Sequence, residues 1–380
     1  MTLPVASFTI RFMEKTDCAI IGAGVIGLTI ARRLAMDGRE VIILEHADAI
    51  GTVTSARNSE VIHAGLYYPK DSLKARLCVE GKQQLYAYLE ERGINHNRCG
   101  KMIVAADEAE LDGLGEIQAK AAANGVDDIK ILSTADARAR EPELTCTGAL
   151  LSPSTGILDS HAFMLALQGD AENHGATLAL LSTVNGGRVD GDRIILDVSS
   201  GGTDMQLSCA TVINAAGLGA QDIASAIDGM PKALIPPLYL SKGCYFSLSG
   251  KAPFQHLIYP LPGQAGLGIH YTRDLGGQGR FGPDSQWVES IDYKVDVSRS
   301  DVFYDSIRRY WPGLPDGSLT PGYAGIRPKI QAPGEDPADF VIQGPTDHGV
   351  NGLINLYGLE SPGLTSSMAI ADLTAEMLAS

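Results

Sequence analysis

The stretch DCAIIGAGVIG, residues 17–27, decides the fold of this 380-residue chain. Asp17–Ile21 is an apolar run that predicts a short buried strand, and Gly24–Met36 predicts a helix that ends at Gly38. Glu40–Leu44 predicts a second buried strand. Strands joined by a helical crossover pair in parallel, so the opening segment predicts one β-α-β unit.

Three glycines in this unit form the pattern G-x-G-x-x-G directly after a strand. Gly22 allows a tight turn, Gly24 lets the backbone approach a pyrophosphate, and Gly27 lets the helix pack on the strand. Glu45 follows 23 residues after Gly22, where a carboxylate accepts hydrogen bonds from ribose hydroxyls and repels a 2′-phosphate. The pattern favours a dinucleotide site over an empty β-α-β unit, and its spacing permits FAD or NAD. The residues expected to line this part of the site are Gly22, Ala23, Gly24, Val25, Ile26, Gly27, Glu45 and His46.

The composition narrows the class of protein. Apolar residues make up 44% and charged residues 20%, which is typical of a globular chain with a sizeable core. Thirty Lys and Arg against 45 Asp and Glu give a net charge of −15, which argues against nucleic acid as a partner. An anionic substrate would therefore need local positive charge. Six scattered cysteines without a CxxC pair predict no metal site and fit a reducing compartment.

The sequence also bears on location. No apolar run reaches 18 residues, so we expect no integral membrane segment. Residues 1–15 lack the basic start and cleavage site of a signal peptide and are interpreted as an N-terminal tail. We expect a cytoplasmic protein, and leave open a peripheral association with the inner membrane face.

The rest of the chain alternates helical and strand patterns. The predicted helices are 73–92, 108–124, 161–174, 301–311 and 364–378. The predicted strands are 101–105, 193–199, 205–208, 211–215 and 354–357, with a glycine-rich loop at 276–287. Between Leu234 and His270 the pattern becomes proline-rich, aromatic and alternating, which indicates antiparallel sheet. The predicted fold class is α/β: a Rossmann-like domain with a parallel central sheet, and a second α+β domain with an antiparallel sheet.

Seven stretches between about residue 17 and residue 378 add up to a family likeness: DCAIIGAGVIGLTIARRL, NSEVIHAGLYYPKDSLKARLCVEG, SPSTGILDSHAFM, VINAAGLGA, LIYPLPGQAGLGIHYTR, YAGIRPKI and YGLESPGLTSSMAIA. In these stretches the chain resembles the D-amino-acid-oxidase-type FAD oxidoreductases. Within them it is most similar to the L-2-hydroxyglutarate dehydrogenase/oxidase branch. The glycine motif is shared by many families, whereas NSEVIHAGLYYP and GLESPGLTSS are far more specific.

The resemblance implies FAD as the cofactor and a discontinuous FAD-binding domain made of residues 16–95, 150–232 and 325–380. Residues 96–149 and 233–324 would form a substrate-binding cap. The implied reaction removes a hydride from a carbon next to a carboxylate and passes it to flavin N5. Electrons would then leave to a quinone, a carrier protein or oxygen. Further flavin contacts are expected at Ser55, Arg57, Asn58, Ser59, Val184, Ala215, Ala216, Gly217, Arg327, Ser361, Pro362, Gly363, Leu364 and Thr365.

One loop departs from the family pattern. Members of this branch commonly have H-Q-T-G-H-N-S-G-V-I-H where this chain has residues 53–63. Val53 and Arg57 replace two of the histidines, Glu60 replaces a glycine, and His63 is retained. Because these residues differ, the flavin contact in this loop and the substrate can also differ from those of the branch.

Five residues are candidates for chemistry and substrate binding. His63 is the candidate general base or flavin contact, because imidazole can take a hydroxyl proton near neutral pH; the alternative is a histidine that only shapes its loop. His270, at the end of the expected strand Gly266–His270, is a candidate second base or donor, with a purely structural histidine as the alternative. Arg327 can grip a carboxylate through two parallel N–H···O bonds, and Lys242 and Tyr259 are lesser candidates for the same task.

These residues support three hypotheses on function. The first is an FAD-dependent enzyme that oxidises a small carboxylate-bearing 2-hydroxy acid, similar to 2-hydroxyglutarate. The second is an amine or amino-acid oxidase that acts on substrates of the glycine or sarcosine type. The third is a non-catalytic flavin-binding protein, against which the presence of both His63 and Arg327 argues. An NAD-dependent dehydrogenase would need a second nucleotide site that the sequence does not display.

Overall fold

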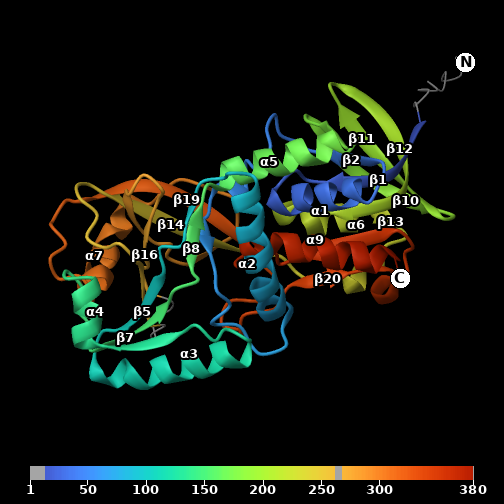
Figure 1. The fold of residues 1–380 in the computed structure, drawn as a ribbon. Coiled ribbons are helices and arrows are strands. Elements are labelled where there is room, and N and C mark those ends of the chain that lie inside the picture. Colours follow the sequence, from blue (N-terminus) through green and yellow to red (C-terminus); the bar gives the residue numbers. More distant parts are fainter. Residues whose placement is uncertain (1–12, 262–267, 380) are drawn as a thin grey trace, which may run out of the picture.

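The structure, a computed structural model, describes residues 13–261 and 268–379. In that part of the chain, two large sheets and one small sheet form the frame of two lobes (Figure 1). The first sheet and helices α1, α5, α6 and α9 make up one lobe. The second sheet and helices α3, α4 and α7 make up the other, and α2 runs between them.

The centre of the first sheet is the predicted β-α-β unit. β1 (Met13–Ile21) leads into α1 (Val25–Met36), and β2 (Val41–Leu44) returns beside β1. The register pairs Cys18 with Val41 and Ile21 with Leu44 in parallel, which confirms the expected pairing. The paired parts of these strands, Cys18–Ile21 and Val41–Leu44, are apolar and mostly buried in the middle of the sheet.

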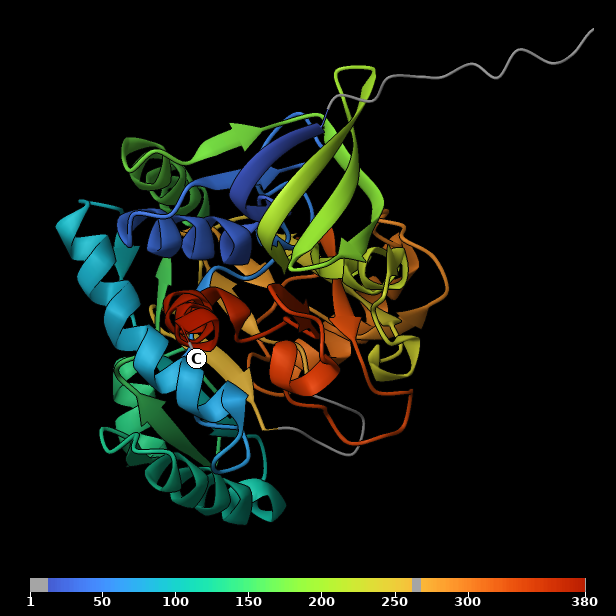
Figure 2. The same ribbon diagram turned by 90° about the vertical axis from the view of Figure 1, so that its right-hand side faces the viewer.

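A single long strand joins the parallel centre of this sheet to an antiparallel wing. β12 (Thr203–Asn214) runs parallel to β1 and, at its end, parallel to β21 (Leu353–Tyr357). Its first half pairs antiparallel with β11 (Arg193–Ser200), which pairs with β10 (Ser182–Asp190). The two separate strands expected at 205–208 and 211–215 are therefore wrong, because pairing with β1 carries one strand through Cys209 and Ala210 between them. Figure 2 shows the wing standing clear of α9.

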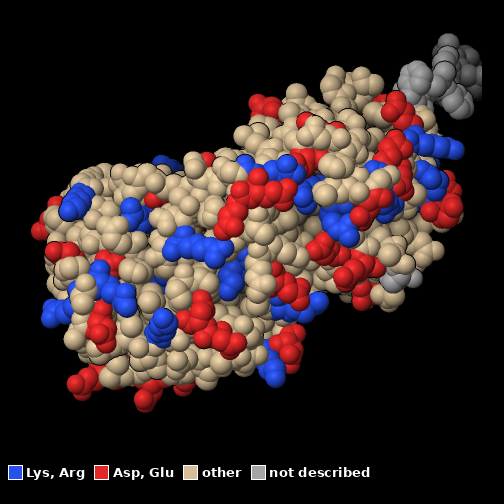
Figure 3. Space-filling model, in the orientation of Figure 1, with Lys and Arg blue, Asp and Glu red and all other residues tan. Residues whose placement is uncertain are grey.

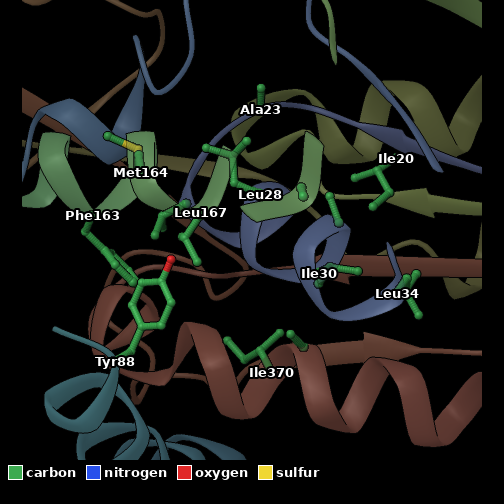
Figure 4. Packing of buried hydrophobic residues seen from close by; sticks show 14 of the residues in the cluster. Ile20, Ala23, Leu28, Ile30, Leu34, Tyr88, Phe163, Met164, Leu167 and Ile370 are labelled. Atoms are coloured by element: carbon green, nitrogen blue, oxygen red, sulfur yellow. The ribbon is translucent and has the colours of Figure 1, made fainter. Parts of the chain in front are cut away.

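Three helices cover one face of the first sheet, α1, α5 (Ser160–Asn173) and α9 (Gly363–Ala379), and α2 (Leu73–Glu91) packs against α9. They share one apolar core, in which Leu28, Phe163 and Ile370 are fully buried (Figure 4). The opposite face carries α6 (Ala220–Ser225) over a second apolar cluster. The predicted helices at 73–92, 161–174 and 364–378 are confirmed to within a residue or so at each end.

The second sheet is mostly antiparallel, as expected. β14 (Tyr239–Leu248) pairs antiparallel with β19 (Leu319–Lys329). β15 (Leu257–Pro260), however, pairs in parallel with β5 (Lys101–Ala105), so the sheet is mixed. β5 in turn pairs antiparallel with β7 (Gly148–Ser152).

The segment 276–287, predicted to be a loop, contains strand instead. β17 (Gly279–Phe281) and the start of β18 (Gln286–Val288) lie in it, and both pair with β14. Its glycines hide any alternation of apolar residues, so this strand structure comes from pairing with a partner far along the chain. α7 (Ser300–Arg308) and α3 (Leu111–Ala123) are somewhat shorter than predicted.

Short elements complete the described chain. β3 (Val61–Ile62), β8 (Gly156–Leu158) and β4 (His96–Asn97) form the small sheet between the lobes. The others are η1 (Thr54–Ala56), η2 (Glu108–Glu110), β6 (Lys130–Ser133), α4 (Thr134–Arg140), β9 (Thr177–Ala179), η3 (Gly217–Gly219), β13 (Ile227–Asp228), η4 (Lys232–Leu234), β16 (Tyr271–Arg273), η5 (Val297–Arg299), β20 (Val341–Gln343) and α8 (Pro345–His348).

The expected domain limits differ from the strand limits at three places. β1 begins at Met13, inside the expected tail of residues 1–15. The limits at 150 and 325 fall within β7 and β19, which belong wholly to the second sheet. The two-domain division stays a prediction, with limits better drawn at the ends of these strands.

The charged residues of both signs that the sequence contains lie on the surface. On the face in Figure 3, acidic and basic side chains are intermixed. In the part of the chain that the structure describes, no helix is long and apolar enough to cross a membrane.

Candidate active site

The turn at Gly22–Gly27, which we call the glycine turn, brings three backbone segments into direct contact. A Cβ on Gly27 would lie 2.0 Å from the Gly22 carbonyl oxygen, so only glycine lets α1 pack this closely on the turn. Gly22 itself has φ +101°, and a Cβ there would lie 2.7 Å from the Ala215 carbonyl oxygen. The small residues after β12 thus allow the end of this strand to approach the turn closely.

The start of α1 is built to receive an anion. Its N-cap residue, Gly24, has no side-chain cap, and no acidic residue stands in the first turn. The Val25 N–H donates to Ser55 Oγ (3.0 Å), and the Ala23 N–H donates to Glu45 Oε2 (2.7 Å). A helix start of this kind, with a carboxylate beside it, fits the pyrophosphate and ribose of a dinucleotide.

Glu45 and His46 differ in their surroundings. Glu45 is buried, and its Oε1 accepts a hydrogen bond from the Ala47 N–H at 2.9 Å. A carboxylate has lone pairs for more partners, so the predicted ribose contact stays a prediction. The side chain of His46 is 65% exposed and lies with Nδ1 2.8 Å from Glu45 Oε1, at the rim of this part of the site.

The loop after β2 makes polar, cation–π and backbone contacts with the second lobe. Ser59 Oγ lies 2.8 Å from the Tyr245 hydroxyl, and the Arg57 guanidinium lies 4.0 Å from the centre of the Tyr293 ring. A Cβ on Gly325 would lie 2.2 Å from the Arg57 carbonyl oxygen, so β19 and this loop touch through their backbones. Asn58 stabilises the loop by donating from Nδ2 to the Ser55 carbonyl.

Glu60, which stands where the family pattern has glycine, adopts a backbone conformation that favours glycine. Its φ is +56°, in the left-handed region that favours glycine. Its Oε1 accepts a hydrogen bond from Ser160 Oγ (2.7 Å) at the start of α5. The residue that departs from the family pattern therefore contributes a contact to α5.

The start of α9 is joined to His63. The His63 N–H donates to Thr365 Oγ1 (3.0 Å), and the Thr365 hydroxyl donates to the Val61 carbonyl (3.3 Å). Ser361 Oγ lies 3.2 Å from His63 Nε2. The expected flavin segment Ser361–Thr365 and the candidate base therefore lie together, and Pro362, Gly363 and Leu364 lie within that helix start.

The other expected flavin contacts lie elsewhere in the first lobe. Val184 is buried in β10, within the apolar cluster under α6. Ala216 and Gly217 follow β12, and Gly217 has φ +58°. These positions surround the glycine turn rather than the His63 side chain.

The His63 imidazole is held in its neutral form. Burial lowers its pKa to about 3, with the positive charges of Lys101 and His270 acting in the same direction. The sequence predicts a base with a pKa near neutral pH, whereas in the structure the pKa of His63 is far lower. A neutral ring can accept a proton throughout the physiological range, but it is a weak base until a negative charge lies beside it.

Lys101, which sequence reasoning missed, lies close to His63. Its side chain is fully buried, with Nζ 4.7 Å from the ring centres of both Tyr67 and Tyr259. Burial lowers the pKa of Lys101 to about 7. In the sequence it opens the apolar strand KMIVA, where a lysine is usually a solvated strand end, so only its burial marks it.

Tyr259 and His270 form a stacked pair beside this lysine. Their ring centres are 3.7 Å apart and their planes differ by 6°. His270 directly precedes β16 instead of ending a strand, and the expected strand Gly266–His270 lies partly outside the described residues. We call His63, Lys101, Tyr259 and His270 the histidine–lysine cluster.

Arg327 stands on β19 with its guanidinium only loosely bound. Nη1 lies 3.4 Å from Ser241 Oγ, and both terminal nitrogens lie 3.4–3.5 Å from the Asp284 carbonyl oxygen. These separations are long for N–H···O bonds, so the donors are available to a stronger acceptor such as a carboxylate. A Cβ on Gly243 would lie 2.9 Å from Nη2, so glycine makes room for this side chain.

Lys242 does not join Arg327, which corrects its expected role as a carboxylate ligand. In the β14–β19 register Ser241 faces Arg327 while Lys242 faces Ile326, so the two cations lie on opposite faces of the sheet. The Lys242 ammonium donates to Asp292 Oδ2 (3.0 Å) and to the Lys294 carbonyl (2.6 Å). Those contacts fix the loop after β18.

A buried ion cluster adds positive charge near Arg327. The Glu360 carboxylate lies 3.1 Å from Lys74 Nζ and 2.6 Å from Lys329 Nζ. Although burial opposes ionisation, the two lysines and Arg327 hold the pKa of Glu360 below its usual value. Two ammonium groups for one carboxylate leave a net positive charge, which supplies the local field that an anionic substrate needs in an acidic chain.

Known proteins resemble this chain in sequence over almost its whole length. The FAD dependent oxidoreductase family matches residues 17–377. The mitochondrial L-2-hydroxyglutarate dehydrogenase of Arabidopsis thaliana is 46% identical over 398 aligned positions, which cover 94% of this chain and 82% of that protein.

Solved structures show the same fold. The FAD-bound L-alpha-glycerophosphate oxidase of Mycoplasma pneumoniae superposes with a TM-score of 0.86 at 22% identity, covering 97% of this chain and 96% of that one. The glycine oxidase of Geobacillus kaustophilus superposes with a TM-score of 0.81 at 22% identity, covering 96% and 95%.

Proposed function

Because the chain belongs to the FAD dependent oxidoreductase family, we propose that it oxidises a small 2-hydroxy acid of the 2-hydroxyglutarate type. The observation that carries the substrate class is the similarity, along almost the whole chain, to a plant L-2-hydroxyglutarate dehydrogenase. The cofactor is FAD, and the glycine turn, the uncapped start of α1 and Glu45 are the residues that would hold its phosphates and ribose. When bound, FAD supplies the acceptor for the hydride.

Arg327 and His63 have separate roles in the reaction. Arg327 binds the carboxylate next to the reacting carbon through two parallel N–H···O bonds, which fixes the orientation of that carbon. His63 accepts the hydroxyl proton at its imidazole. The negative charge of a bound carboxylate opposes the effect of Lys101 and His270 on His63, and so raises its pKa when the substrate is present.

An amine or amino-acid oxidase is the competing hypothesis. The likeness to the glycine oxidase is in fold alone, at 22% identity. A neutral amine needs no base, so an enzyme of that kind would not require a half-buried imidazole linked to the start of α9.

Anaerobic mixing of the holoenzyme with single substrates tests the proposal. We expect L-2-hydroxyglutarate to bleach the flavin absorbance and glycine, sarcosine and other amino acids to leave it unchanged. Bleaching by an amino acid and by no 2-hydroxy acid would reject the proposal in favour of the oxidase. No bleaching by any of them would favour the non-catalytic flavin protein.

The electron acceptor and the location form part of the proposal. A quinone, a carrier protein or oxygen could take the electrons, and reoxidation of the reduced holoenzyme by each in turn identifies the one used. We propose a cytoplasmic location, which the absence of any disulfide between the six described cysteines supports. Fractionation of cells that produce the protein would test it.

A further inference from the structure

Residues 51–59 of the loop after β2, which we call the covering loop, lie directly on the glycine turn. The Gly51 N–H donates to the Ala23 carbonyl at 3.0 Å. Ser55 Oγ accepts the Val25 N–H, also at 3.0 Å, in the first turn of α1. Because the start of α1 is where the FAD phosphates fit, the position of this loop bears on how firmly FAD is bound.

Three tyrosines of the second lobe contact the covering loop. The Tyr323 hydroxyl donates to the Asn58 carbonyl, and the Tyr245 hydroxyl lies 2.8 Å from Ser59 Oγ. Tyr245 and Tyr323 stack on each other with their ring centres 4.4 Å apart. Tyr293 makes the third contact, through the face of its ring.

The contact at Tyr293 is a cation–π pair with Arg57. The guanidinium carbon lies 4.0 Å from the ring centre, well within the roughly 6 Å over which a ring face attracts a cation. Neither Arg57 Nε nor the Tyr293 hydroxyl has a hydrogen-bond partner in the described part of the chain, although both atoms are buried. The ring face therefore fixes the Arg57 side chain without help from the tyrosine hydroxyl.

Lys242 fixes the position of Tyr293 in turn. Its ammonium donates to Asp292 Oδ2 at 3.0 Å and to the Lys294 carbonyl at 2.6 Å, so it binds the chain neighbours of Tyr293 on both sides. The Lys294 N–H also donates to Asp292 Oδ1 at 2.9 Å. Because Lys242 belongs to β14, these bonds attach the backbone around Tyr293 to the second sheet.

We propose that Tyr293 is a positioning residue of the FAD site: its ring holds Arg57, and with it the covering loop, on the glycine turn and so slows the release of FAD. The second lobe would then control the retention of a cofactor whose phosphates bind in the first lobe. This goes beyond the proposed oxidation of a 2-hydroxy acid, because it concerns the cofactor and requires no substrate.

The rate at which FAD leaves the holoenzyme tests the proposal. Holoenzyme loaded with radiolabelled FAD is mixed with an excess of unlabelled FAD, and the label that stays on the protein is followed over time. Tyr293→Ala should speed release about 2- to 30-fold, the range that the strength of a cation–π pair gives. Arg57→Met should also speed it. The double variant should release FAD no faster than the faster single variant, because both changes remove one interaction.

Three further variants separate the ring contact from other effects. Tyr293→Phe keeps the ring and removes a hydroxyl that has no partner, so it should release FAD at the wild-type rate. Arg57→Lys keeps the charge and should retain part of the effect. Trp287→Ala is the matched control, because the Trp287 ring packs on Tyr239 at 6.5 Å rather than on the covering loop. It should leave the release rate unchanged.

Four results would overturn the proposal. They are wild-type release from Tyr293→Ala, multiplied acceleration in the double variant, a Tyr293→Phe variant as fast as Tyr293→Ala, or equal acceleration by Trp287→Ala. If Tyr293→Ala does not fold, Arg57→Met carries the same test because it leaves the Tyr293 ring in place. Failure to oxidise any 2-hydroxy acid would reject the proposed function alone, since the exchange of FAD is measured without substrate.

Discussion

The glycine turn and the histidine–lysine cluster are built in opposite ways. The turn lies almost wholly within residues 17–45, and its contacts join backbone atoms. The cluster takes four side chains from three remote stretches of the chain and depends on burial and charge. Changes in the turn should therefore disturb geometry, and with it the cofactor and the fold. Changes in the cluster should alter rate and selectivity in a folded holoenzyme.

Gly27→Ala should have the largest effect of all these variants. A small effect would contradict the contrast between the glycine turn and the histidine–lysine cluster. The new Cβ would meet the Gly22 carbonyl at 2.0 Å, so α1 must shift off the turn. We expect loss of bound FAD and a fall in stability of more than about 3 kcal/mol, measured by flavin absorbance and denaturant unfolding. Gly115→Ala is the control: it is a helical glycine with open space around it, where alanine should stabilise by up to about 1 kcal/mol.

Arg327→Ala should lower kcat/KM for the 2-hydroxy acid by on the order of 10²–10³, because the carboxylate loses a bidentate partner. Flavin content and unfolding temperature should stay close to those of wild type. Steady-state kinetics with flavin quantified per protein checks this. Release of flavin would instead move Arg327 to a cofactor role.

His63→Gln should slow anaerobic flavin reduction on the order of 100-fold, the usual contribution of a general base. Stopped-flow absorbance measures that rate. Ser361→Ala removes only one hydrogen bond to the ring and should cost far less. An unchanged rate in His63→Gln would remove the imidazole from the mechanism and leave it a structural role.

The charge of Lys101 should appear in the pH dependence of stability. Its pKa in the folded protein is about 7, below its ordinary value of 10.5, so the unfolded chain binds more protons between these values. Stability of the substrate-free holoenzyme should therefore rise between pH 7 and 9, by at most about 1.4 kcal/mol per pH unit from this group. Lys101→Met should show a shallower rise in urea unfolding. Identical slopes would contradict a buried, unpaired ammonium.

Lys242→Ala should have the smallest effect on catalysis. Its ammonium faces away from Arg327 and pairs with Asp292, whose side chain is 61% exposed. A pair with an exposed partner contributes little because water screens it, so stability should change little and KM by less than about twofold. A tenfold rise in KM would restore Lys242 to the substrate site.

The sequence alone determined the parts of this protein whose physics is local. The glycine spacing after β1 and the position of α1 follow from backbone sterics between neighbours in the chain or in the β-α-β unit. Family likeness made His63 and the Ser361–Thr365 segment separate expected flavin contacts, and the structure brings them within hydrogen-bond distance of each other.

Only the tertiary structure decided which charged groups are buried together. Lys101 and Lys242 look alike in sequence, each in an apolar strand, and strand pairing put one against His63 and the other against Asp292. It also joined two expected strands into β12 and made strands of a glycine-rich segment. The physical reason is that a charge has its pKa and its partners set by what surrounds it in space, and those surroundings come from residues far away in the chain.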